Sequence, residues 1–157
     1  AAIKHIDRIP ELSSAFASEA WKLLLQCKSN IDEHSLASIL VRWLEKTQNT
    51  TIALALADSI QHEQGASEAE NFILRHIKRN PTMKGFHRLM TYQLVAMHDD
   101  KAAESISLLR SLVEKQMAVK PVYRCEHCGF SSKVIFWHCP SCKQWGSISP
   151  IQGLDGD

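Results

Sequence analysis

The chain has 157 residues, of which 45% are hydrophobic, so it can bury a core in one ordinary domain or in a medium domain plus a very small one. Eighteen lysines and arginines against seventeen aspartates and glutamates leave a formal net charge of +1. No global field therefore recruits nucleic acid or an anionic membrane surface. The longest uncharged apolar run, Thr47 to Ala57, is shorter than the roughly 20 residues of a membrane span, so we expect a globular chain without one.

The five cysteines are unevenly distributed along the chain. Four fall within the last 35 residues, and Cys27 stands alone in a helical stretch, where we expect it to be a small buried apolar residue. An odd count with this distribution fits a reduced, cytosolic compartment better than a disulfide scaffold. The chain begins at Ala1 rather than at methionine, so we expect it to be a piece of a longer protein.

Apolar residues recur at helical spacing from about residue 10 to residue 118. The pattern predicts one helix from Glu11 to Lys28, after Pro10, and a second from Asp32 to the break at 47–49. A third is expected from Thr51 to Glu63, with Gly65 as its stop.

Three more helices are expected after Gly65. Ser67 with Glu70 predicts a capping box that opens a helix through Arg79, which Asn80-Pro81 ends. The next two span Thr82 to Met97 and, with Asp100 as its cap, Lys101 to Ala118.

The predicted helices are paired and carry a faint repeat. A shift of 34 residues lays 68–70 near 102–104, and Ala69 lies 12 residues from both Ala57 and Pro81. These are tetratricopeptide intervals, although the consensus tryptophan and tyrosine are absent. We therefore predict a mainly α fold with degenerate tetratricopeptide-like antiparallel helix pairs over residues 1–119. An irregular helical bundle is the alternative.

A second small domain is predicted over residues 120–157, because helical periodicity stops at Tyr123 and strand-like pieces such as 133–137 appear. It contains two CxxC pairs, separated by ten residues. Two such turns facing each other place four thiolates around one ion, and thiolates select zinc or iron over magnesium or calcium. The predicted ligands of one zinc or iron ion in a tetrahedral site are Cys125, Cys128, Cys139 and Cys142.

Four cysteines complete a coordination shell and leave no position for a substrate or an activated water. We therefore expect His127 and His138 to flank the site without binding the metal. The chain has no Gly-rich phosphate loop, no G-x-S-x-G and no H-E-x-x-H, so no catalytic residue is predicted. His62, His76 and His87 are expected on helix surfaces or between helices.

Large apolar residues follow the cysteines closely, and most of them are expected to form a small core around the metal, with one or two packing on the last helix. They are Phe130, Phe136, Trp137, Trp145 and Ile148.

Three functions are compatible with a closed metal site beside helices. An FeS4 electron carrier would show reversible one-electron chemistry. A nucleic-acid ribbon would need a basic surface, but the tail has three basic and three acidic residues. A protein-binding scaffold needs neither, and we prefer it.

The tail resembles the C-terminal end of the lipopolysaccharide assembly protein B family, and the similarity extends upstream to about residue 65. The residues that carry it are 123–125, 128–130, 137–142, Trp145, 150–151 and 153–156 in the tail, and 79–83, 86–87, 89–90 and 104–105 before it.

The resemblance implies a C-terminal fragment of a cytoplasm-facing inner-membrane protein of Gram-negative bacteria, whose further repeats and N-terminal anchor lie outside this chain. Such proteins are non-catalytic adaptors that promote degradation of the deacetylase LpxC by the membrane protease FtsH, under control of the membrane protein YejM. Their rubredoxin-like (zinc-ribbon-like) domain packs against the repeats. The resemblance implies neither a nucleic acid nor a small-molecule substrate, and no partner-binding residue carries over. A rubredoxin-type electron-transfer module on a helical scaffold is the alternative.

Overall fold

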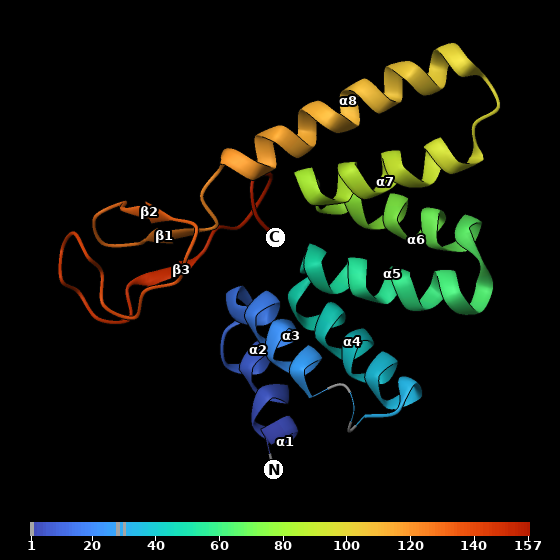
Figure 1. Cartoon of the computed structure of the whole chain (residues 1–157). Coiled ribbons are helices and arrows are strands. Elements are labelled where there is room, and N and C mark those ends of the chain that lie inside the picture. The colour runs from blue at the N-terminus through green and yellow to red at the C-terminus, as the bar shows by residue number, and fades with distance from the viewer. Residues whose placement is uncertain (1, 28, 30) are drawn as a thin grey trace.

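The computed structural model describes residues 2–27, 29 and 31–157. Helices occupy most of the chain and stack in chain order, from the N-terminal end to α8 (Figure 1). They are α1 (Ala2–Asp7), α2 (Ile9–Leu12), the 3-10 turn η1 (Ser14–Phe16), α3 (Ala17–Gln26), α4 (Glu33–Thr47), α5 (Thr50–Gln64), α6 (Ala66–Arg79), α7 (Met83–Ala96) and α8 (Asp100–Val119). The mainly α fold class is confirmed, and no described helix is long and apolar enough to span a membrane.

The helices recur at a regular interval. α3, α5 and α7 begin at residues 17, 50 and 83, and α4, α6 and α8 begin at residues 33, 66 and 100. Each helix is therefore repeated after 33 or 34 residues. Ala57 and Ala69, the small residues of the predicted pattern, are fully buried between α5 and α6. This arrangement is compatible with tetratricopeptide-like repeats.

Short polar side chains start three of the helices at the predicted breaks. Asp32 accepts a hydrogen bond from the Ser35 amide at 2.9 Å, and Asn49 accepts one from the Ile52 amide at 3.1 Å. Thr82 caps α7 in the same way. Each cap satisfies a backbone donor that the helix itself leaves unpaired.

The predicted helix from Glu11 to Lys28 is wrong, because the chain breaks at Ser13. That residue has extended geometry, with φ −153° and ψ 110°, between α2 and η1. The break leaves Leu12 78% exposed and starts α3 at Ala17, so the fully buried Ala17 and Ala20 face the core. The predicted end at Lys28 lies outside the described residues.

Two predicted caps are also wrong. Only Gly65 separates α5 from α6, so Ser67 already lies inside the first turn of α6 and forms no capping box. α8 is capped by Asp99 instead of Asp100, since the Asp99 carboxylate accepts from the amides of Lys101 and Ala102.

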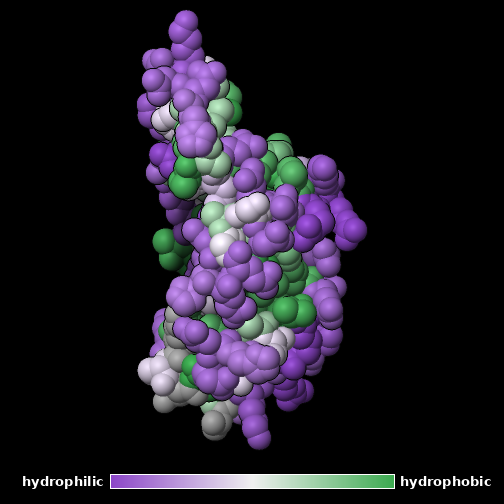
Figure 2. Space-filling view, turned by 90° about the vertical axis from the view of Figure 1, so that its right-hand side faces the viewer, coloured by the Kyte–Doolittle hydropathy of each residue, from purple (hydrophilic) through white to green (hydrophobic). Residues whose placement is uncertain are grey.

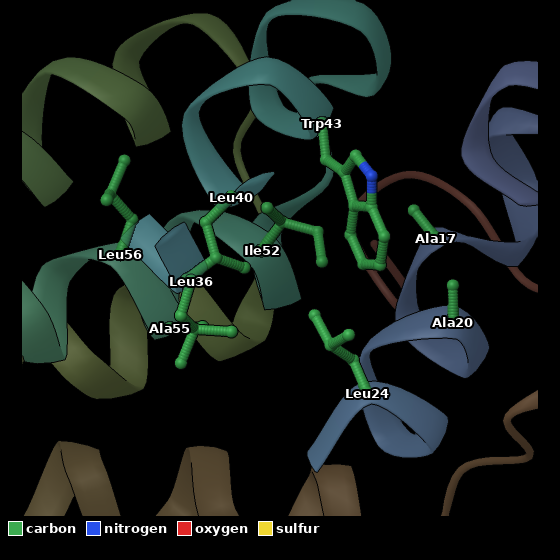
Figure 3. Close-up of a cluster of buried hydrophobic side chains, with 9 residues drawn as sticks. All are labelled: Ala17, Ala20, Leu24, Leu36, Leu40, Trp43, Ile52, Ala55 and Leu56. Carbon is green, nitrogen blue, oxygen red and sulfur yellow. The ribbon is translucent and has the colours of Figure 1, made fainter. Parts of the chain in front are cut away.

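The main core lies where α3, α4 and α5 meet around the fully buried Trp43 (Figure 3). The Trp43 indole nitrogen donates to Asp7 in α1 at 2.9 Å, which ties the N-terminal helices to this core. A smaller cluster joins α5, α6 and α7. α8 packs on α7 but contributes no buried residue, and Leu108 on its outer face is 60% exposed.

The last segment forms a three-stranded antiparallel sheet in the order β2–β1–β3. The strands are β1 (Tyr123–Cys125), β2 (Ser131–Ser132) and β3 (Ile148–Pro150), and β1 pairs Cys125 with Ile148. The predicted strand at 133–137 is wrong, because this stretch is an irregular loop. The loop carries the chain from one cysteine pair to the other, so it cannot continue along β1.

Candidate metal centre

The four tail cysteines converge on one point. Their sulfur atoms all lie within 4.8 Å of one another, with Cys125 3.8 Å from Cys142 and Cys128 3.7 Å from Cys139. A disulfide requires about 2.05 Å, so these are free thiols. A tetrahedron with metal–sulfur bonds of about 2.3 Å has sulfur–sulfur edges of about 3.8 Å. The four cysteines are therefore positioned to bind one metal ion.

Two matching turns position these sulfur atoms. In the first, the Gly129 amide donates to the Cys125 carbonyl at 2.9 Å, and in the second the Lys143 amide donates to the Cys139 carbonyl at 3.0 Å. The cysteine that opens each turn donates in both cases to the carbonyl five residues later. Each CxxC pair thus sits on the same backbone scaffold.

Both turns end in a left-handed residue. Gly129 has φ 77° and Lys143 has φ 61°, so the lysine adopts the conformation that favours glycine. A side chain in this region costs roughly 1–2 kcal/mol. The missing glycine at Lys143 was visible in the sequence, but the retained turn geometry was not.

Hydrogen bonds and burial act differently on the cysteines. The Ser147 hydroxyl, 3.1 Å from the Cys125 sulfur, and nearby backbone amides lower the pKa of Cys125 to about 6 against the effect of burial. The backbone amide of Phe130 lowers the pKa of Cys128. The backbone amide of Gln144 lowers the pKa of Cys142, but burial and the neighbouring sulfur atoms outweigh it and raise this pKa to about 12. Four thiolates this close require a bound cation.

The apolar shell around the sulfur atoms is smaller than predicted. Ile148 is buried and Phe130 is half-buried against it, but Phe136, Trp137 and Trp145 are 39%, 64% and 74% exposed. The space between the two turns is filled largely by the cysteines and Tyr123, so the larger aromatics point outward.

The exposed aromatics pack outside the metal domain's core. Trp137 stacks on Phe16 in η1, with ring centroids 6.5 Å apart, and not on the last helix as expected. Trp145 packs on His138 at 4.7 Å. Neither His127 nor His138 belongs to the group of metal-binding side chains found among the described residues.

The metal domain touches α3 through Tyr123, two residues before the first cysteine. The Tyr123 hydroxyl donates to Glu19 at 2.5 Å and accepts from Lys22 at 3.2 Å. This contact and the Trp137–Phe16 stack fix one side of the domain against α3 and η1. Sequence reasoning missed it, because the partners lie about a hundred residues apart.

The last residues reach α5 and α7. The Asp157 side chain is 4% exposed, lies 2.8 Å from Lys84, and accepts from the Thr51 hydroxyl at 2.5 Å and amide at 3.2 Å. The Met83 amide donates to the Leu154 carbonyl at 2.9 Å. Both contacts lie at helix N-termini, where partial positive charge favours an oxygen acceptor. Burial would raise the pKa of Asp157, but Lys84 and hydrogen bonds from Thr51 and Ser18 hold it below its usual value.

The three helical histidines lie away from the sulfur atoms. His76 is buried between helices, with Nε2 3.2 Å from the Thr50 hydroxyl, and burial lowers its pKa. His62 is exposed, and His87 Nε2 lies 4.0 Å from Glu114. These positions agree with the prediction.

The fold and the site together define a mainly helical chain that ends in a metal-binding domain of rubredoxin type. Residues 123–150 match the family described as "Rubredoxin metal binding domain".

Similarity extends to the whole chain. It is 36% identical over 156 residues to "Lipopolysaccharide assembly protein B" of Escherichia coli strain K12, which covers 99% of this chain and 40% of that protein. The protein of the same name from Haemophilus influenzae is 30% identical over 98% of this chain and 39% of its own length. The resemblance to the lipopolysaccharide assembly protein B family is confirmed, and the chain spans about two fifths of the length of these relatives.

The two left-handed residues give a matched pair of substitutions. Gly129→Ala should destabilise the zinc-loaded domain by about 1 kcal/mol, through backbone strain alone, because no atom lies within 4 Å of the added methyl. Lys143→Gly should raise its stability slightly, since it relieves the same strain. Thermal unfolding followed by near-ultraviolet circular dichroism tests both. A shift in the same direction for both variants would contradict this account.

Zinc affinity should rise with pH. The thiol of Cys142, with a pKa of about 12, is protonated at neutral pH without metal, whereas Cys125, at about 6, is already ionised. Displacing one proton makes affinity rise roughly tenfold per pH unit between pH 7 and 8. Competition with a chromophoric chelator measures it.

Ser147→Ala is the control, because it removes the hydroxyl that lowers the pKa of Cys125. A second proton then competes with the metal, and the pH dependence should become steeper. An affinity that is flat across this range would count against the four-thiolate site.

Proposed function

We propose that this chain is the metal-containing part of a non-catalytic adaptor in lipopolysaccharide assembly. Cys125, Cys128, Cys139 and Cys142 would hold one zinc or iron ion within a unit formed by residues 120–157. Residues 1–119 would form a tetratricopeptide-like unit that binds proteins. The names of the relatives support the pathway, and the complete four-cysteine set supports a structural metal.

The proposed partners follow from the family resemblance. In this proposal, the protein helps FtsH degrade LpxC, under regulation by YejM, at the cytoplasmic face of the inner membrane. An N-terminal anchor outside this sequence would attach it to the membrane. The chain needs no active site for this role, because its contribution is to position one protein beside another.

The observation that carries the proposal is the docking of the metal domain on three helices. Tyr123 contacts α3, Asp157 contacts α5, and the Leu154 carbonyl contacts α7. When bound, the metal supplies a rigid, closed centre that cross-links the two cysteine turns. The domain then fixes how these helices lie relative to one another, and so completes a protein-binding surface.

A rubredoxin-type electron carrier is the second candidate, because Cys128 is exposed and would bring an iron–sulfur centre close to solvent. Elemental analysis of native protein with a visible spectrum separates the two. Iron with reversible one-electron reduction would favour the carrier, and zinc would favour the adaptor.

Removing two ligands tests the adaptor directly. In the full-length protein, Cys125→Ser with Cys128→Ser should release the metal, free the domain from the helices and stop LpxC turnover. LpxC half-life, followed by immunoblotting after synthesis is blocked, measures the effect.

Cys27→Ser is the matched control, because Cys27 is a half-buried thiol outside the metal cluster. It should leave LpxC turnover unchanged. Normal turnover in the double variant would refute the proposed role of the metal domain.

A further inference from the structure

A groove of about 580 Å³ opens between the first repeating helices, next to the docking contacts of the metal domain. Its walls come from α3, α4 and α5, and Arg88 of α7 closes one side. The surface turned toward the viewer in Figure 2 is mostly hydrophilic, with scattered hydrophobic patches. A groove with an apolar lining is therefore distinct from the general surface.

The lining is apolar because two pairs of side chains share helix faces at i and i+4 spacing. Trp21 and Leu25 come from α3, and Leu36 and Leu40 from α4. Leu54 of α5 completes the lining. Leu36 and Leu40 are buried beneath it, whereas Leu25 remains 44% exposed. Apolar area is thus available to an incoming side chain.

The rim of the groove is acidic. Glu33, Asp58 and Glu63 are exposed around it, and the only Arg or Lys in its lining, Arg88, is paired with Asp58. Glu33 and Glu63 form no ion pair with any residue in the described part of the chain. Two negative charges therefore flank an apolar lining, which suits a positively charged apolar partner.

The exposure of the polar groups favours a protein segment over a small molecule. Small-ligand sites usually hold a few converging polar groups inside a largely enclosed cavity. Here the carboxylates of Glu33, Asp58 and Glu63 lie at the exposed rim. A segment lying along the helices can place apolar side chains in the groove and basic side chains at the rim.

We propose that this groove binds a short apolar segment of a partner protein that carries lysine or arginine on both sides. The inference rests on the proposed adaptor function, and it specifies the chemistry of one partner. The metal domain acts at one end of the groove, because the groove residue Thr51 donates its hydroxyl to Asp157. Docking of the tail therefore sets the position of α5 in the groove.

Two labelled peptides test the groove on the whole zinc-loaded chain. Fluorescence polarisation compares the peptide Lys-Leu-Ala-Leu-Leu-Lys with its glutamate counterpart, Glu-Leu-Ala-Leu-Leu-Glu. The lysine peptide should bind roughly tenfold more tightly at low salt, and the preference should shrink as salt screens the rim charges. Equal affinity for the two peptides would overturn the proposal.

Charge reversal identifies where the peptide binds. Glu33→Lys with Glu63→Lys should abolish or reverse the preference. Glu104→Lys with Glu114→Lys changes the net charge equally on exposed positions of α8, away from the groove, and should preserve it. All four positions are exposed, so these variants should fold, and circular dichroism checks it. An equal loss in both double variants would overturn the proposal.

Fluorotryptophan labelling gives an independent readout, since the chain has four tryptophans and only Trp21 lines the groove. The lysine peptide should shift the Trp21 resonance and leave the buried Trp43 and the metal-domain tryptophans unchanged. A shift confined to Trp137 or Trp145 would overturn the proposal. Groove binding combined with normal LpxC turnover in the cysteine variants would retain this groove and reject the adaptor role.

Discussion

Four sulfur atoms within 4.8 Å of one another are the constraint on which the C-terminal part of this protein depends. Thiolates at this separation repel one another unless a cation lies between them. A segment of about 35 residues buries too little apolar surface to offset that repulsion, and its largest aromatics, Trp137 and Trp145, point outward. Metal binding supplies on the order of 10 kcal/mol in such domains, so here it decides whether the segment folds.

Folding of the metal domain extends to the helices through residues that adjoin the cysteines. Tyr123 lies on the same strand as Cys125, so fixing the sulfur also fixes the phenol against Glu19. β3 pairs with β1 and leads into the tail that ends at Asp157. The Asp157 carboxylate then meets Thr51 at the start of α5 and Lys84 in the first turn of α7. A local metal centre thereby acts on helices distant in sequence.

Local patterns predicted what local chemistry determines. The spacing of Cys125, Cys128, Cys139 and Cys142 indicated one metal site, and Asp32, Gly65 and Pro81 marked helix ends, because ligand reach and capping depend on near neighbours. The break at Ser13 and the exposed face of α8 could not be predicted in this way, since apolar periodicity does not reveal which face finds a partner. The docking of Asp157 was missed for the same reason, because its partner Thr51 lies 106 residues away.

Hydrogen exchange of two backbone amides measures this coupling most directly. The Thr51 amide donates to Asp157 at 3.2 Å and the Met83 amide donates to Leu154 at 2.9 Å, so both are protected only while the tail is docked. Removing zinc with a chelator should speed exchange at both amides, while the Ile52 amide, bonded to Asn49 within α5, stays protected. Unchanged exchange at Thr51 and Met83 after metal removal would contradict the claim that the metal domain holds these helices in place.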